Sequence, residues 1–186
     1  MRHKYTTEAL VLARHPLKEA GMLTALLTKE FGLIHARAEG VRRSGAKLAH
    51  ALQTLRMSEV YLVRGKEGWR LTGAHLRDDC FAELSGEARV RAARVSGLLQ
   101  RLLGKDISDT SAFDQYIEFV DALRTLEQTH YDSAETLIAL RLLHTFGIDA
   151  GEVPPEGYTP VALSYAKESK QSLVERINHG IFASGL

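Results

Sequence analysis

Cysteine is nearly absent from this 186-residue sequence, since Cys80 is the single example. One cysteine cannot form an internal disulfide, and without a Cys-x-x-Cys pair it cannot build a structural zinc site. The eight histidines do not compensate, because no two of them are spaced as an H-x-x-x-H pair. We therefore expect neither a metal ion nor any other cofactor.

Long apolar runs are also missing. No run approaches the roughly 18 residues that a membrane-spanning helix requires, and residues 1–5 lead into an alternating segment rather than into a signal-peptide core. Hydrophobic residues still make up 45% of the chain, which excludes a disordered polymer and leaves room for one or two domains with genuine cores. These features predict a cytoplasmic protein that does not contact a membrane.

A strong charge of one sign is absent from the chain as a whole, whose formal net charge is +1. This balance hides two opposite halves. Residues 1–77 hold fourteen Lys and Arg against six Asp and Glu, whereas residues 78–186 hold ten against seventeen, so the halves carry +8 and −7. Such asymmetry favours two modules, a basic one with an anionic partner and an acidic one with another role.

The basic half reads as a series of short strands, because its apolar residues alternate with polar ones or form short runs bounded by turn residues. Strands are expected at residues 9–13, 22–28, 33–38, 55–63 and 69–76. Five short strands within residues 1–78 predict a five-stranded OB-fold β-barrel, a common host of nucleic-acid strands at this size.

The apolar period changes to that of helices after residue 78. Helices are predicted at residues 87–103, 111–129, 134–146 and 169–182, with a Pro- and Gly-rich loop at residues 151–160. Ser85 and Gly104 suit the two ends of the first helix, and Gly147 suits the end of the third, which is apolar nearly all round and should be the most buried. The fold class is therefore α+β, with an OB-fold domain at residues 1–78 and a helical bundle domain at residues 79–186.

The region between the third and fourth strands concentrates positive charge. Residues 37–47 combine four cations with two hinge glycines: Arg37, Gly40, Arg42, Arg43, Gly45 and Lys47. Glycine lets the backbone approach a partner closely, and arginine forks suit phosphate oxygens. The loop is therefore either a grip for a polyanion or a solvated turn. The next hairpin extends the positive charge with Arg64, Lys66 and Arg70.

Two aromatic residues near this hairpin are candidates for stacking on a base. Tyr61 and Trp69 stand within the fourth and fifth predicted strands. Aromatic platforms bind single strands of any sequence. The alternation in which both residues sit also allows each ring to pack in the core, which is the simpler interpretation.

Motifs of catalysis are not found in the sequence. Residues 40–47 resemble the P-loop pattern G-x-x-x-x-G-K-[ST], but the lysine is displaced by one position and Leu48 stands where a hydroxyl should hold magnesium. Asp114, Glu118 and Asp121 share one helix face, as carboxylates of a solvated surface do. We expect that the protein is not an enzyme.

A second basic feature lies within the acidic half. Arg91, Arg94 and Arg101 lie close together on the first predicted helix, with Leu98 between them. This strip of positive and apolar side chains either docks an acidic, apolar peptide end or packs against the barrel or the bundle.

Several segments carry the pattern of a known family. Five lie in the first half with matching order and gaps: residues 8–12, 19–34, 40–52, 61–65 and 69–72. Two weaker ones are residues 140–147 and 177–186. Together they resemble the bacterial DNA repair protein RecO family. The resemblance implies an N-terminal OB domain, a helical C-terminal domain and a nucleoid-associated recombination mediator. Such a mediator binds single- and double-stranded DNA, anneals complementary strands and, with RecR, helps to load RecA onto strands covered by the single-stranded-DNA-binding protein.

Two departures from the family pattern stand out. Many members carry the cysteines of a zinc module after the third helix, but residues 148–168 contain none, so no zinc is expected. The chain is also shorter than typical members, with a trimmed helical region. Within that region the strip of Arg91, Arg94, Leu98 and Arg101 is the candidate docking site for the acidic tail of the single-stranded-DNA-binding protein.

The candidate DNA-binding residues follow from the basic loop and the hairpin: Arg37, Arg42, Arg43, Lys47, Arg64, Lys66, Trp69 and Arg70. A basic surface lowers the mutual repulsion of two strands by releasing condensed counterions, so annealing needs no catalytic group. Two other functions stay open at this point. One is an OB-fold adaptor whose basic face binds an acidic protein and never DNA; the other is an RNA-binding OB protein.

Overall fold

The computed structural model describes residues 3–17, 21–39, 47–79, 82–104 and 110–185. The chain divides into two compact units. The barrel unit comprises Met1–Ala82 and Leu103–Phe113, and the helical unit comprises Glu83–Leu102 and Asp114–Leu186. The placing of a domain boundary after residue 78 stays a prediction.

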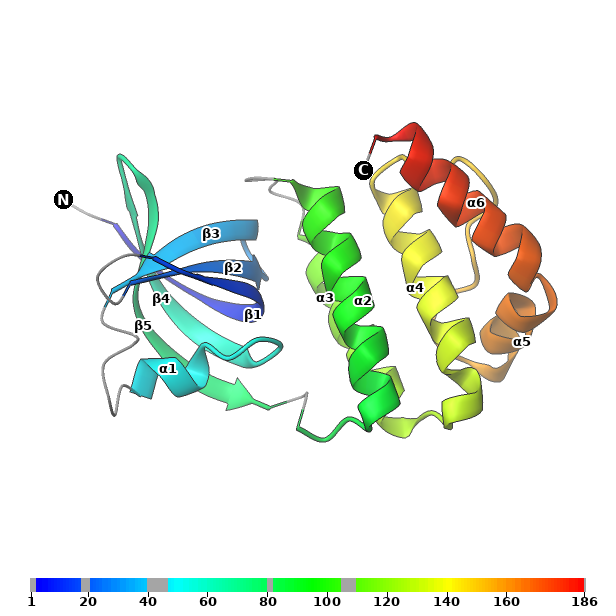
Figure 1. Cartoon of the computed structure of the whole chain (residues 1–186), viewed down its shortest axis with the longest axis horizontal. Helices are drawn as coiled ribbons and strands as arrows, with labels where there is room; N and C mark the ends of the chain where they lie inside the picture. Colours follow the sequence, from blue (N-terminus) through cyan, green and yellow to red (C-terminus); the bar gives the residue numbers. More distant parts are fainter. Residues whose placement is uncertain (1–2, 18–20, 40–46, 80–81, 105–109, 186) are drawn as a thin grey trace. The chain divides into compact units, whose positions relative to one another are not determined.

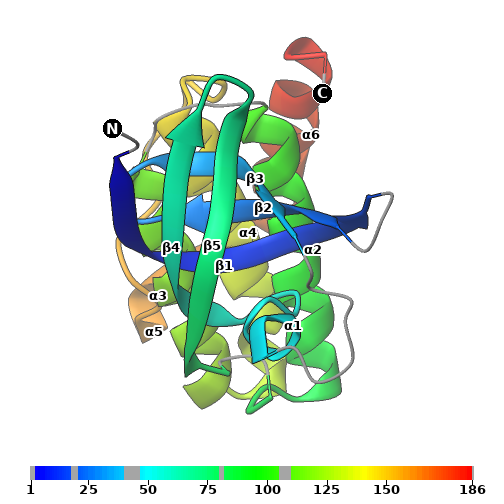
Figure 2. The same cartoon turned by 90° about the vertical axis from the view of Figure 1, so that its left-hand side faces the viewer.

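The barrel unit is built from five strands (Figures 1 and 2). They are β1 (Lys4–Pro16), β2 (Met22–Thr28), β3 (Gly32–Ala38), β4 (Met57–Gly65) and β5 (Gly68–Asp78). They close in the order β1-β2-β3-β5-β4, in which only the β3 and β5 pair is parallel. The predicted five-stranded barrel is therefore confirmed. A short helix, α1 (Lys47–Ala51), precedes β4 and was not predicted.

Strand β1 is the longest strand and joins both neighbours. Residues 4–10 pair with β4 and residues 9–16 with β2, and a bulge between Val11 and Ala13 interrupts the pairing with β2. A bulge bends a strand, which lets one strand take part in the closure of a barrel. Alternate side chains fill the interior, where Val11, Leu26 and Leu62 are fully buried.

The turn before β4 contains a strained residue. Leu55 has a φ of 65°, a region that side chains with a Cβ rarely adopt, and is only 5% exposed. Its backbone N–H donates to the Val11 carbonyl at 2.7 Å, and the Val11 N–H donates to the Arg56 carbonyl at 3.2 Å. These two hydrogen bonds join the turn to the neighbouring strand β1.

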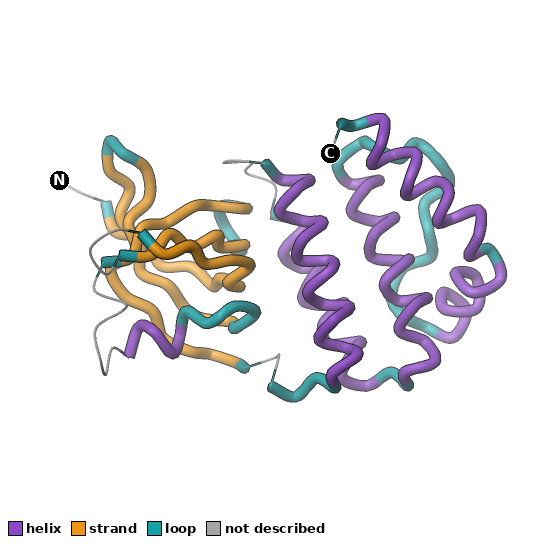
Figure 3. Tube along the Cα trace, viewed as in Figure 1, coloured by secondary structure: helices purple, strands orange, loops and turns teal. Residues whose placement is uncertain are grey.

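The helical unit draws on five helices and a short 3₁₀ turn, η1 (Gln128–His130) (Figure 3). The helices are α2 (Gly86–Leu103), α3 (Ser111–Thr125), α4 (Tyr131–Thr145), α5 (Pro160–Glu168) and α6 (Lys170–Ala183). Four of them match predicted helices within a few residues. Helix α5 was missed, although Thr159 caps it by accepting from the Ala162 N–H and Pro160 stands in its first turn.

Helix ends follow the expected local chemistry. The Ser85 hydroxyl accepts from the Ala88 N–H at 3.2 Å, and Gly104 has a φ of 53° after the last turn of α2. Gly147 has a φ of 68°, and the Ile148 N–H returns to the Leu143 carbonyl at 2.8 Å, so α4 ends in a left-handed glycine cap. Helix α4 has ten buried residues, as its apolar surface predicts.

The connection from α4 to α5 is held by one arginine. The Arg141 guanidinium donates to the carbonyls of Pro155 and Gly157 and lies 4.9 Å from the centre of the Tyr158 ring. Burial raises the pKa of the Tyr158 hydroxyl well above its usual range.

None of the helices in the described residues is long and apolar enough to cross a membrane.

Candidate nucleic-acid interface

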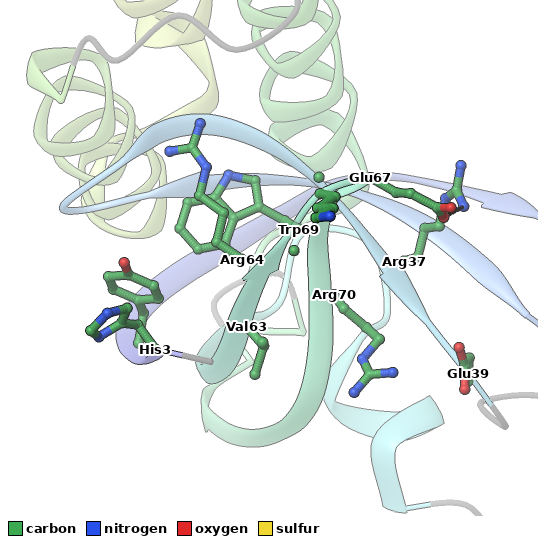
Figure 4. Close-up of a pocket in the computed structure, with 12 residues that line it drawn as sticks. His3, Arg37, Glu39, Val63, Arg64, Glu67, Trp69 and Arg70 are labelled. Carbon is green, nitrogen blue, oxygen red and sulfur yellow. Dashed lines mark hydrogen bonds and ion pairs between the residues drawn. The ribbon is translucent and has the colours of Figure 1, made fainter. Parts of the chain in front are cut away.

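An open groove of about 860 Å³ lies on the barrel unit (Figure 4). Its lining includes five of the residues that the sequence nominated for DNA binding: Arg37, Arg64, Lys66, Trp69 and Arg70. They come from β3, from β4, from β5 and from the turn between β4 and β5. Folding therefore gathers side chains from separate strands into one basic surface.

The hairpin between β4 and β5 presents part of this charge. Gly65 pairs with Gly68, so Lys66 and Glu67 form a two-residue turn. Gly68 has a φ of 102°, which a residue with a side chain would adopt only under strain. The glycine thus permits a tight turn that carries Lys66 at its tip.

Strand register aligns further cations across the sheet. Arg37 of β3 is the partner of Arg70 on the parallel strand β5, and Arg70 and Lys4 flank Val63 of β4 from either side. All three cations are exposed. Neighbouring strands lie about 4.8 Å apart. Lys4, Arg70 and Arg37 therefore form a row of positive charges that crosses strands β1, β4, β5 and β3. Lys4 was not nominated from the sequence, because the first strand was expected to begin only at residue 9.

Few carboxylates oppose this charge. Glu67 lies 3.4 Å from Arg37, but their side chains are 86% and 58% exposed, so the pair contributes at most about 1 kcal/mol. Glu39 also lines the groove. Within the described ranges, Arg64, Lys66 and Arg70 have no ion pair with a carboxylate. These side chains are therefore free to meet an external anion.

Trp69 lines the groove but is mostly buried beneath it. It is 8% exposed and belongs to the barrel core, where its ring lies 5.3 Å from those of Tyr5 and Phe31. The Arg64 guanidinium lies 5.1 Å from the Trp69 ring centre and covers it (Figure 4). Stacking of a base on Trp69 stays a prediction. In the structure the Trp69 ring packs in the barrel core and lies beneath the Arg64 guanidinium.

The remaining nominated DNA-binding residues are not described. Arg42 and Arg43 fall outside the described residues, as does Cys80. Lys47 opens helix α1, but its side chain is likewise not described. A DNA grip by these three cations stays a prediction.

A second groove, of about 600 Å³, lies in the helical unit between α2, α4 and α6. All four residues of the nominated docking strip line it: Arg91, Arg94, Leu98 and Arg101. The lining also includes apolar side chains of α6, namely Val174, Ile177 and Ile181, and the carboxylates Asp132 and Glu135 of α4. The groove is therefore basic along one helix and apolar along another.

The arginines of this groove are not equally available. Arg91 is held by Asp132 at 2.8 Å and Glu135 at 2.6 Å, and the Glu135 hydrogen bond raises the pKa of Arg91. Arg94 lies 3.6 Å from Glu135 but is 59% exposed. Arg101 is exposed and has no ion pair with a described carboxylate. Arg94 and Arg101 are thus the cations that an incoming carboxylate can reach.

The acidic partners of Arg91 were missed from the sequence. Asp132 also accepts a hydrogen bond from Lys170 at 3.0 Å, which lowers the pKa of its carboxyl. These contacts join residues about forty positions apart in the sequence, so no local sequence pattern predicts them.

No catalytic or metal-binding arrangement emerges from the parts of the chain that the structure describes. Asp114, Glu118 and Asp121 are all exposed on α3, and Asp121 lies 3.0 Å from Arg124. No group of three His, Cys, Asp or Glu residues there could hold a metal ion.

The chain is similar in sequence to a known protein family. A protein family described as "Recombination protein O N terminal" matches residues 1–78. The DNA repair protein RecO of Heliobacterium modesticaldum is 32% identical over 143 residues, which cover 77% of this chain and 51% of that protein. The RecO of Cutibacterium acnes is 31% identical over 132 residues, covering 67% and 50%. One from Dehalococcoides mccartyi is 38% identical over 72 residues, covering 39% and 28%. Even the longer matches span only about half the length of these relatives.

Proposed function

Because this chain belongs to the RecO family of DNA repair proteins, we propose that it is a recombination mediator whose barrel unit binds single- and double-stranded DNA. The observation that carries the proposal is the groove in which Arg37, Arg64, Lys66 and Arg70 converge from different strands. Most of these cations lack a carboxylate partner among the described residues, so phosphates are the natural ligands.

The proposed mechanism is electrostatic. Each phosphate that a lysine or arginine neutralises releases condensed counterions, so binding becomes weaker as salt rises. Two complementary strands held on one basic surface repel each other less, and base pairing then joins them. In this function the side chains bind and orient the strands, and no bond is broken.

The helical unit serves a protein partner in this proposal. Its groove offers exposed arginines beside apolar side chains of α6, which suits a peptide that ends in acidic and apolar residues. The tail of the single-stranded-DNA-binding protein has that chemistry. Delivery of RecA onto covered strands, together with RecR, is the wider function in which both grooves would act.

Oligonucleotide binding at several salt concentrations tests the proposal. Arg64→Ala combined with Arg70→Ala is expected to weaken binding of a labelled single strand about tenfold or more at low salt. The slope of log affinity against log salt should fall by about 1.4, because roughly 0.7 is lost for each phosphate contact on a single strand. Fluorescence anisotropy measures both quantities.

A matched pair of lysines controls for a general loss of charge. Lys66→Ala removes a cation of the groove, whereas Lys29→Ala removes one outside it that pairs with Glu8 at 3.7 Å. Only Lys66→Ala should change the salt slope. If the double arginine variant binds oligonucleotides as well as the native chain does, the DNA proposal fails and an adaptor for an acidic protein is favoured. Tighter binding of RNA than of DNA of equal length would instead favour an RNA-binding protein.

A further inference from the structure

Tyr61 is an unusual residue for the middle of a paired strand. It lies on β4, between β1 and β5, yet its side chain is 41% exposed. Its partners in register are Thr6 and Gly73. A large aromatic ring at such a position leaves a flat apolar face accessible to a ligand.

The ring is fixed in place from below and at its tip. A Cβ at Gly73 would lie 3.0 Å from the Tyr61 ring, so the ring packs on the space that this glycine leaves free. The Tyr61 hydroxyl donates to Glu59 Oε1 at 2.6 Å, and the other oxygen of Glu59 accepts from Arg77. One face of the ring is therefore held against the sheet while the other stays open.

The surroundings of the ring suit a polyanion. A shallow hollow of about 480 Å³ is lined by Tyr61 together with Lys4, Arg70 and Thr72. This hollow shares Tyr5, Val63 and Arg70 with the basic groove, so the two surfaces are continuous. Two nearby acids each have a cationic partner, since Glu8 lies 3.7 Å from Lys29 and Glu59 pairs with Arg77.

We propose that the open face of Tyr61 stacks on an unpaired base of a single nucleic-acid strand, with Lys4 and Arg70 contacting the phosphates on either side. The strand passes from the groove over Arg70 and across β4. The inference rests on the proposed DNA-binding function and deepens it, since it assigns the stacking platform to Tyr61 rather than to buried Trp69. Bases inside a duplex are already stacked, so Tyr61 favours single strands over duplexes.

Comparison of a normal strand with an abasic strand separates stacking from charge. Tyr61→Leu in the full chain is expected to weaken binding of an oligothymidine by about five- to a hundredfold, the range for the loss of one base stack. Binding of an abasic strand with the same number of phosphates should not change. Tyr61→Phe keeps the ring and should bind both strands as the native chain does. Fluorescence anisotropy gives the affinities, and circular dichroism checks the fold of each variant.

Failure of this inference differs from failure of the DNA-binding proposal. If Tyr61→Leu binds both strands normally while Arg64→Ala with Arg70→Ala weakens them, Tyr61 does not stack and the groove still binds DNA. Equal weakening on both strands would also overturn stacking. If neither variant affects either strand, the DNA-binding proposal itself fails.

Photochemical cross-linking keeps the inference testable should Tyr61→Leu not fold. A strand that contains 5-iodouracil is cross-linked to the native chain, which is then digested with trypsin. Residues 57–64 form one peptide in which Tyr61 is the sole aromatic residue, and residues 67–70 form another that contains Trp69. The cross-link is expected in the first peptide. A cross-link in the second alone would assign stacking to Trp69 and overturn the inference.

Discussion

The arginines of the barrel groove differ in their pairing from the least exposed arginines of the helical unit. In the barrel unit Arg64 and Arg70 reach the groove without an ion pair to a described carboxylate, and the Arg37 pair with Glu67 is largely exposed. In the helical unit Arg91 is only 21% exposed and is held by two carboxylates, and Arg176 is 24% exposed beside Asp149. Partnered arginines fix helices together, whereas unpartnered ones remain available for another molecule.

Net charge alone therefore does not locate a binding surface. The helical half is acidic overall, yet it contains a groove in which Arg94 and Arg101 stay accessible, because Glu135 pairs most closely with Arg91 and Asp132 is shared by Arg91 and Lys170. Internal pairing decides which cations can act.

Removal of Arg176 should have the largest effect. Asp149 is 8% exposed and accepts from Arg176, so Arg176→Ala leaves a buried carboxylate without its cation. We expect a loss of about 2–3 kcal/mol in the free energy of unfolding, toward the lower end for such a change because Arg176 is partly exposed. Arg70→Ala in the barrel should lose less than about 0.5 kcal/mol. Urea denaturation measures both, and equal losses would remove the contrast between the units.

Charge reversal at Arg101 should weaken peptide binding without weakening the fold. Arg101→Glu places a carboxylate in the helical groove and is expected to reduce affinity about tenfold for a synthetic peptide that ends in aspartates and apolar residues. Lys167→Glu is the matched control, since Lys167 is exposed on α5 and does not line the groove. Isothermal titration calorimetry gives the affinities. A similar effect of both reversals would mean that the groove is not the docking site.

The smallest effect concerns Lys170 and pH. The hydrogen bond from Lys170, and then the charge of Arg91, lower the pKa of Asp132. A carboxyl whose pKa is lowered by folding adds stability above its unfolded pKa of about 3.9, and this stability disappears as pH falls through the folded value. Lys170→Ala should therefore cost a few tenths of a kcal/mol at pH 7, because Asp132 and Lys170 are about half exposed and solvent screens the pair.

Unfolding in urea at two pH values checks this difference. The stability gap between the native chain and Lys170→Ala should be present at pH 7 and should close in acid, once the pH lies below the lowered pKa of Asp132. Lys170→Arg retains the charge and should show little gap at either pH. A gap that persists in acid would show that Lys170 stabilises α6 by packing rather than through Asp132.

The sequence predicted most of the secondary structure because alternation and helical period are local signals. Four of the barrel strands and four helices lie close to their expected ranges, whereas β1 begins five residues before the expected residue 9. Helix α1 was missed because its five residues are too few to show a period, whereas α5 was missed despite the signal of Thr159 and Pro160. The sequence also allowed Trp69 to be read either as core or as a platform, and burial at 8% exposure is a property of the closed barrel.

The candidate sites were predicted only as lists of residue types. Arg64, Lys66 and Arg70 could be nominated because they follow one another along a hairpin. The placement of Lys4 and Arg70 on either side of Val63 depends on strand register, and the contact between Arg91 and Glu135 depends on helix packing. Such contacts between distant segments exist only in the folded chain, which is why exposure and pairing had to come from the structure.

The turn before β4 shows how far the barrel determines its own local conformation. A left-handed backbone at a residue such as Leu55 costs about 1–2 kcal/mol, and no local sequence preference supports it. Burial of the Leu55 side chain, worth roughly 2 kcal/mol, and the two backbone hydrogen bonds that join the turn to Val11 offset that strain. The turn is therefore a product of barrel closure rather than its cause, and a peptide of this segment alone would not be expected to hold it.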